Sequence, residues 1–138
     1  MHIIGENIQI LAPKIKAAIA NRDATYVREL ARVQVENGAN MLDLNIGPAR
    51  KGGAELMEWI VKTVQEVTDL PLFLDTSNVE AIEAGLKVYQ PKKGKAIINS
   101  IMARPERMEA LIPLAGKYGA GMVALLWGPE GMPRDTDE

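Results

Sequence analysis

Short apolar runs that each end in a polar side chain recur along the chain, at intervals long enough to hold a helix. Four of them occupy residues 3–6, 41–45, 72–75 and 96–99. Continuous apolar runs of this length are typical of parallel strands that are buried on both faces. The pattern therefore predicts alternating strands and helices, with functional residues at the carboxyl ends of the strands.

Helical patterns fill the intervals between these runs. Apolar residues at steps of three and four predict helices over residues 13–20, 26–37 and 54–67. The inward face of the third helix is expected to comprise Leu56, Trp59, Ile60, Thr63, Val64 and Val67. Ser77 and Glu80 form an S-x-x-E sequence whose side chains each satisfy a free backbone N–H, so a helix capped by Ser77 is expected just after Asp75.

The last predicted helix begins at Arg104-Pro105, because proline suits the first turn, and it ends near Gly119. The residues expected to face inward are Met108, Leu111, Ile112 and Ala115, with a kink at Pro113. Residues 121–127 read as a fifth strand, followed by a loop rich in Gly and Pro. Residues 135–138 spell a D-x-x-E helix start with nothing after it, so we expect a truncated chain.

Two architectures fit five strands joined by helices. A (β/α)8 barrel has about 250 residues, so the 138-residue chain matches its amino-terminal half, a single partial barrel domain over residues 1–138. A small doubly wound sheet is the alternative, but it requires a glycine-rich phosphate turn after the first strand, and residues 5–8 do not form one. We therefore expect the half-barrel of a TIM barrel, which leaves two unpaired, apolar sheet edges.

Composition excludes several classes of function. The chain is 47% hydrophobic and 25% charged with a net charge of −2, which suits one core and offers no basic stripe for nucleic acid. With no Cys, disulfides, thiolate metal sites and nucleophilic Cys chemistry are excluded, and no metal site is expected. No apolar run approaches the roughly 20 residues of a membrane span, so we expect a cytoplasmic protein without membrane contact.

Polar residues at the strand ends are the candidate functional residues. Because side chains alternate along a strand, Asp43 and Asn45 share a face, and Asp75 and Asn99 end the next two strands. With Glu6 they predict a ring of carboxylates and amides that has no Lys, Arg or His opposite. A carboxylate accepts two parallel hydrogen bonds from an amino group and an adjacent ring N–H, so the ring suits a donor-rich heterocycle such as a pterin.

Four segments carry a resemblance to a known family: GENI (residues 5–8), LDLNIGPA (42–49), LFLDTSN (72–78) and AIINS (96–100). In this order and spacing they resemble the pterin-binding (β/α) barrels. The similarity is greatest to the methyltetrahydrofolate:corrinoid/iron–sulfur protein methyltransferases, to which the folate domain of cobalamin-dependent methionine synthase is related. The segments MEWIVKTVQEVTDLP, NVEAIEAGLK and GMPRDTD are similar as well. The resemblance spans the whole chain but only the amino-terminal half of the family's domain.

The resemblance implies roles for these residues. Asp75 and Asn99 would hydrogen-bond the pterin, Asp43 and Asn45 would shape the pocket, and Glu6 is a further pterin-binding candidate. In the family a second pterin-binding Asp and a catalytic Asn come from later strands, so the catalytic residue is expected outside this chain. The implied reaction, in one-carbon metabolism of the Wood–Ljungdahl type, moves the methyl group of 5-methyltetrahydrofolate to a cobalt(I) corrinoid on a partner protein. Catalysis would come from positioning the substrate and from hydrogen bonding to the leaving pterin nitrogen.

Other functions stay open. Dihydropteroate synthase is the alternative pterin enzyme, although its N-x-T-x-D-S type run is not found at residues 6–11. A non-catalytic half-barrel is another: its apolar edges would pair with a second copy, as a homo-oligomer, or with a complementary carboxyl-terminal half, and alone it would be inactive. Arg104 and Arg107, near the mouth, are expected to form a solvated helix start rather than to contact a polyglutamate tail or an acidic partner.

Overall fold

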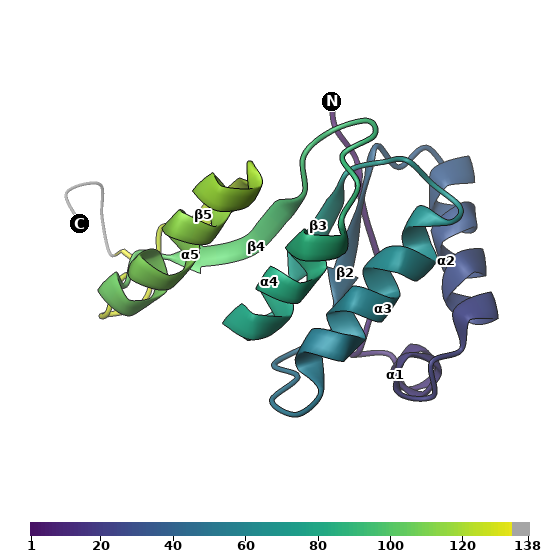
Figure 1. Cartoon of the computed structure of the whole chain (residues 1–138), viewed down its shortest axis with the longest axis horizontal. Coiled ribbons are helices and arrows are strands. Elements are labelled where there is room, and N and C mark those ends of the chain that lie inside the picture. The colour runs from purple at the N-terminus through teal and green to yellow at the C-terminus, as the bar shows by residue number, and fades with distance from the viewer. Residues whose placement is uncertain (134–138) are drawn as a thin grey trace.

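A single parallel sheet forms the centre of the computed structural model, which describes residues 1–133 (Figure 1). Its strands are β1 (Ile4–Gln9), β2 (Met41–Asn45), β3 (Leu72–Asp75), β4 (Ile97–Met102) and β5 (Gly121–Leu125). They lie side by side in chain order, and each pairs in parallel with the next. A doubly wound sheet reverses direction within its strand order. The observed order therefore confirms the half-barrel pattern and excludes the doubly wound alternative.

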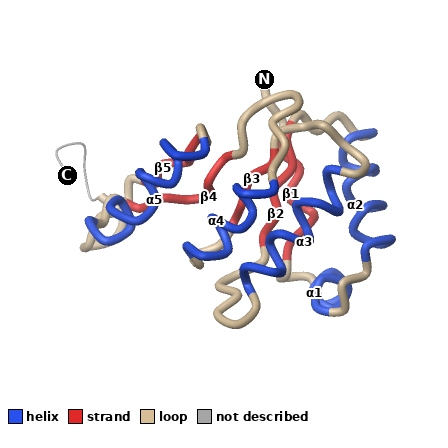
Figure 2. Tube along the Cα trace, in the orientation of Figure 1, coloured by secondary structure: helices blue, strands red, loops and turns tan. Residues whose placement is uncertain are grey.

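Helices connect the strands: α1 (Pro13–Ala20), α2 (Ala24–Glu36), α3 (Gly53–Gln65), α4 (Val79–Val88) and α5 (Pro105–Tyr118). Figure 2 shows α2 to α5 along one side of the sheet, with α1 beyond the end of β1. The strand residues that join the helices in one apolar cluster are Leu42, Leu44, Leu72, Leu74 and Ile98, all fully buried. Strands β2 and β3 therefore turn their leucines toward the helices, which leaves Asp43, Asn45 and Asp75 on the opposite face.

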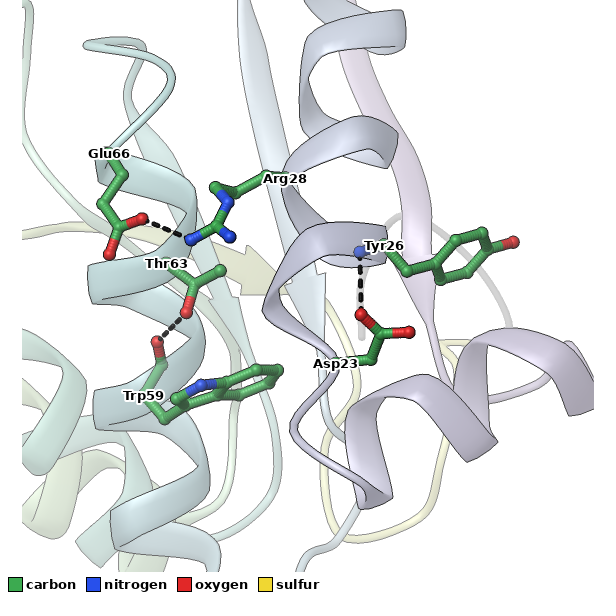
Figure 3. Close-up of polar contacts among 6 residues, drawn as sticks. All are labelled: Asp23, Tyr26, Arg28, Trp59, Thr63 and Glu66. Carbon is green, nitrogen blue, oxygen red and sulfur yellow. Dashed lines mark hydrogen bonds and ion pairs between the residues drawn. The ribbon is translucent and has the colours of Figure 1, made fainter.

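Helices α2 and α3 are joined by a polar contact at their surface (Figure 3). Arg28 Nη1 on α2 lies 2.7 Å from Glu66 Oε2, just past the end of α3. Because both side chains are partly exposed, this pair contributes little to stability. The start of α2 is capped by Asp23, whose Oδ1 accepts a 3.0 Å hydrogen bond from the Tyr26 N–H and contributes about 1 kcal/mol.

Helix α4 packs closely on α3 and β3 because residue 85 is a glycine. A Cβ atom at Gly85 would come within 2.7 Å of Met57 Cγ and 3.0 Å of Leu74 Cδ1. A larger residue would push α4 away from the strand, at a cost typical of overpacking a core, about 1–3 kcal/mol. The close fit holds α4 against β3, whose last residue is Asp75.

The cap of α4 differs from the prediction. Asn78 rather than Ser77 is the cap, and its Oδ1 accepts from the Ala81 N–H at 3.2 Å. The reason lies in the turn before the helix, where Thr76 Oγ1 accepts from the Asn78 N–H at 3.1 Å. This turn carries the chain one residue further before the helix begins, and Ser77 is left exposed.

The inward faces of α3 and α5 also differ from the prediction. Helix α3 buries Met57, Ile60, Val61, Thr63 and Val64, whereas Leu56, Trp59 and Val67 are only partly buried. On α5, Leu111 and Ala115 are buried, but Met108 and Ile112 are 40% and 45% exposed. The reason is that α4 flanks α5 on one side, while no described helix flanks it on the other.

The carboxyl-terminal part of the described chain follows the prediction with small changes. Helix α5 continues past Pro113 and is closed by Gly119 in the left-handed conformation (φ 62°), which glycine adopts without strain. Strand β5 ends two residues before the predicted limit of residue 127. The D-x-x-E sequence at residues 135–138 lies outside the described residues.

Candidate functional site

The ends of three neighbouring strands bring polar side chains into one row. Asn45 on β2 pairs in register with Asp75 on β3, and Asp75 pairs with Asn99 on β4. Neighbouring strands lie about 4.8 Å apart, so the three side chains are adjacent on one face of the sheet. Asp43 lies two residues before Asn45, on the same face but deeper in the sheet.

Two side-chain hydrogen bonds join these four residues into two pairs. Asn45 Nδ2 donates to Asp75 Oδ2, and Asn45 Oδ1 accepts from the Gly47 N–H at 2.9 Å. Asn99 Nδ2 donates to Asp43 Oδ1 at 2.9 Å, across the intervening strand β3. Each amide therefore orients one carboxylate. Within the described chain, Oδ1 of Asp75 and Oδ1 of Asn99 receive no hydrogen bond.

Glu6 belongs to the same acidic group through its charge. Strand β1 departs from regular pairing between Gly5 and Ile8, and the Asn7 N–H donates to the buried Gln34 Oε1 at 2.9 Å. This irregularity leaves Glu6 exposed, where its charge raises the pKa of both Asp43 and Asp75. Among the described residues it shares no hydrogen bond with either of them, so Glu6 acts on the group electrostatically.

Burial raises the pKa of both aspartates. Asp43 is only 4% exposed, and the loss of solvent raises its pKa to about 7. The hydrogen bond from Asn99 opposes this shift, and the charges of Asp75 and Glu6 add to it. The pKa of Asp75 is raised chiefly by burial as well, against the hydrogen bond from Asn45. Near neutral pH Asp43 is therefore populated in both its protonated and its ionised form.

A cavity of about 310 Å³ opens where β3 and β4 end. This volume is at the lower end of small-molecule sites, about 300–1,000 Å³. Its lining includes Asp75, Ser77, Asn99, Met102, Arg104 and Arg107. Two of the predicted site residues thus line the cavity directly. The prediction that both arginines are simply solvated is incomplete, because they line the cavity and are partly buried.

Two residues that fix the cavity loops have no clear signal in the sequence. Thr76 Oγ1 donates to the Gly47 carbonyl, and Asn78 Nδ2 donates to the Ala49 carbonyl at 2.9 Å. Both bonds join the loop after β2 to the loop after β3, between residues 29 positions apart. The sequence around Thr76 indicates a turn, but such distant partners cannot be read from it.

Among residues 1–133, no group of three or more His, Asp or Glu side chains is placed to hold a metal ion. None of the helices described there has both the length and the apolar character to cross a membrane.

Comparison with known proteins places this chain in a family. Residues 14–138 match the family described as pterin binding enzyme, so the chain belongs to the pterin-binding enzymes, as the sequence motifs predicted. The chain is also 32% identical, over 114 residues, to a methylcorrinoid:tetrahydrofolate methyltransferase from Eubacterium limosum. The alignment covers 83% of this chain and 41% of that relative. The chain therefore spans less than half of the relative's length.

Proposed function

We propose that this chain forms the pterin-binding wall of an enzyme that transfers a methyl group between a tetrahydrofolate and a corrinoid. The observation that carries the proposal is the pair Asp75 and Asn99, which line one cavity from adjacent strands and whose Oδ1 atoms receive no hydrogen bond from the described residues. The edge of a pterin ring carries an amino group beside a ring N–H, and two adjacent acceptors complement it. The similarity to a tetrahydrofolate-dependent methyltransferase supports the same class of ligand.

The chemistry required of these residues is binding and orientation. When 5-methyltetrahydrofolate donates, the bond from the pterin nitrogen to the methyl carbon breaks, a carbon–cobalt bond forms, and the electron pair returns to nitrogen. That nitrogen leaves readily only when it is protonated or hydrogen-bonded. The relative's name describes the opposite direction, which passes through the same transition state. Asp75 and Asn99 hold the ring in either direction, and Asp43 positions Asn99.

A methyl-transfer assay tests this proposal. The chain is assayed alone and then mixed with a segment that supplies further barrel strands, such as the carboxyl-terminal part of the Eubacterium limosum relative, while the absorbance of a free corrinoid is followed. We expect no turnover by the chain alone, because loss of one preorganised donor costs about 100–1,000-fold. Turnover should return with the added segment. Robust turnover by the chain alone would contradict the role assigned to the later strands.

A different pterin reaction would be revealed by a parallel assay. Dihydropteroate synthase condenses a pterin with p-aminobenzoate, and in this chain the residues that follow Glu6 continue β1 to Gln9 rather than forming a loop. We therefore expect methyl transfer and no condensation. Condensation without methyl transfer would favour the synthase.

A structural role in assembly is the second candidate. It is favoured by apolar side chains that stay exposed around α5 and β5, namely Met108, Ile112, Met122, Leu126 and Trp127. Exposed apolar surface beside an unpaired strand edge favours association with another chain or segment. Assembly and pterin binding are compatible, because the exposed set shares no residue with the cavity lining.

A further inference from the structure

Two arginines line the cavity at the start of α5, beside the acidic residues. Arg104 is the residue that precedes α5, and Arg107 lies in its first turn. The Arg104 Nε atom is buried and has no hydrogen-bond partner among the described residues. A buried donor on a charged group is costly to leave unpaired. The N–H at Arg104 Nε therefore needs a hydrogen-bond acceptor that the described residues do not supply.

The charges around the two arginines favour an anion. Neither arginine forms an ion pair with a carboxylate of the described chain, and Arg107 Nη1 donates to the Ser77 carbonyl at 2.9 Å. Glu106 also lines the cavity and offsets one of the two positive charges. Asp75 faces the same cavity, where its oxygen serves the ring of the ligand. The lining therefore carries two arginines and two carboxylates, and only Glu106 comes from the same helix turn as the arginines.

The arginines lie further out than the acceptor oxygens. Strand β4 continues three residues past Asn99 to Met102, a rise of about 10 Å, before α5 begins. Asp43 lies on the opposite, inner side of Asn99, to which it is hydrogen-bonded. The cavity therefore has an acceptor-rich inner end and a cationic outer end.

We propose that Arg104 and Arg107 bind the carboxylate tail of the pterin substrate, the glutamate end of a folate. This inference rests on the proposed function and names the part of the substrate that the site selects. With the amino edge of the ring at Asp75 and Asn99, the opposite end of the ring, which carries the tail, points outward. A guanidinium binds a carboxylate through paired N–H donors, so the two arginines distinguish a folate from a pterin without a tail.

Titration calorimetry with two ligands tests the inference. The probes are 6-methyltetrahydropterin, which has no tail, and 5-methyltetrahydrofolate, and both are titrated into the chain alone and into the chain with the added segment. We expect the folate to bind at least 10-fold more tightly, and this ratio should shrink as salt is raised. Arg104→Met and Arg107→Met should each lower folate affinity roughly 10-fold and change affinity for the tail-less pterin less than twofold. Glu106→Gln should act in the opposite direction and tighten folate binding.

Arg32→Met is the matched control, because Arg32 lies on α2 and pairs with Glu29 rather than lining the cavity. Each variant is melted to confirm that it folds. If wild-type protein binds both ligands equally, the inference is wrong while the proposed function stands. The same holds if the arginine variants weaken both ligands alike, which would show that the arginines only hold the loop. If wild-type protein binds neither ligand, the proposed function fails and the inference fails with it. The comparison of the two ligands on wild-type protein tests the inference even if a variant does not fold.

Discussion

Each aspartate of the site is oriented by an amide from a neighbouring part of the sheet. Asn45 holds Asp75, and Asn99 holds Asp43. The strand-end pattern predicted that these four residues share one face of the sheet, because side chains alternate along a strand. The pairing between them could not be predicted, since it depends on the register of three strands and on the Gly47 N–H that fixes Asn45. Asn99 lines the cavity, so Asp43 acts through it rather than on a ligand directly.

The pKa of Asp43 yields a prediction for stability against pH. Because its pKa is raised from 3.8 to about 7 in the folded chain, the folded state holds a proton that the unfolded state releases. This contribution is present below pH 4 and is lost as the pH rises to about 7. Asp43→Asn keeps an acceptor for Asn99 and removes the titration. Urea unfolding should show wild type losing about 2 kcal/mol relative to this variant between pH 5 and pH 8.

Asp69→Asn is the control for that measurement, because Asp69 is a partly exposed acid paired with Lys92, away from the site. Its curve should run parallel to that of wild type over the same pH range. If Asp43→Asn also ran parallel to wild type, the raised pKa of Asp43 would be refuted.

At the scale of elements, the hydrophobic pattern was sufficient for the order and type of the strands and helices. The pattern did not predict burial correctly where burial depends on whether a neighbouring helix covers the face. The pattern placed Met108 and Ile112 inward on α5, but a face is buried only where another element covers it, and α4 covers just one side. Likewise Val61 on α3 is buried because helices lie on both sides of α3. Periodicity shows which residues share a face and not which faces are covered.

The cap of α4 provides a test at this scale. Asn78→Ala removes both the cap and the hydrogen bond to the Ala49 carbonyl, so it should lower the free energy of unfolding by about 1–2 kcal/mol. Ser77→Ala should change it by less than about 0.5 kcal/mol, because Ser77 is exposed and does not cap the helix. Urea melts of the two variants give the comparison. A larger loss for Ser77→Ala would restore the S-x-x-E prediction.

At the scale of the whole molecule, five parallel strands in chain order form an open sheet. Strand β1 at one edge and β5 at the other each pair with a single described strand. Apolar residues near both edges are exposed, with Ile3 at 45% and Leu11 at 83% near β1, and Leu126 at 78% near β5. Open apolar edges of this kind favour association with another chain or segment.

Sedimentation velocity tests this expectation. The chain should associate as its concentration rises, and Ile112→Glu should reduce the association by placing a charge on the exposed face of α5. Val33→Glu is the matched control, because Val33 is similarly exposed, at 42%, but lies on α2. A monomer at all concentrations with a cooperative melt would show that the open edges need no partner.

The most direct test of the central claim is the affinity of one variant for 5-methyltetrahydrofolate. In wild type Asp75 Oδ2 accepts from Asn45, whose orientation is fixed by Gly47, and Asp75 lines the cavity with Oδ1 unbonded among the described residues. In Asp75→Asn the new amide must turn its oxygen to Asn45, so its NH₂ group would face the N–H donors of the pterin. Calorimetry of the chain with the added segment should show a loss of about 2–4 kcal/mol in binding, with Asp69→Asn unchanged. Equal affinity for wild type and Asp75→Asn would contradict the assignment of this site to a pterin.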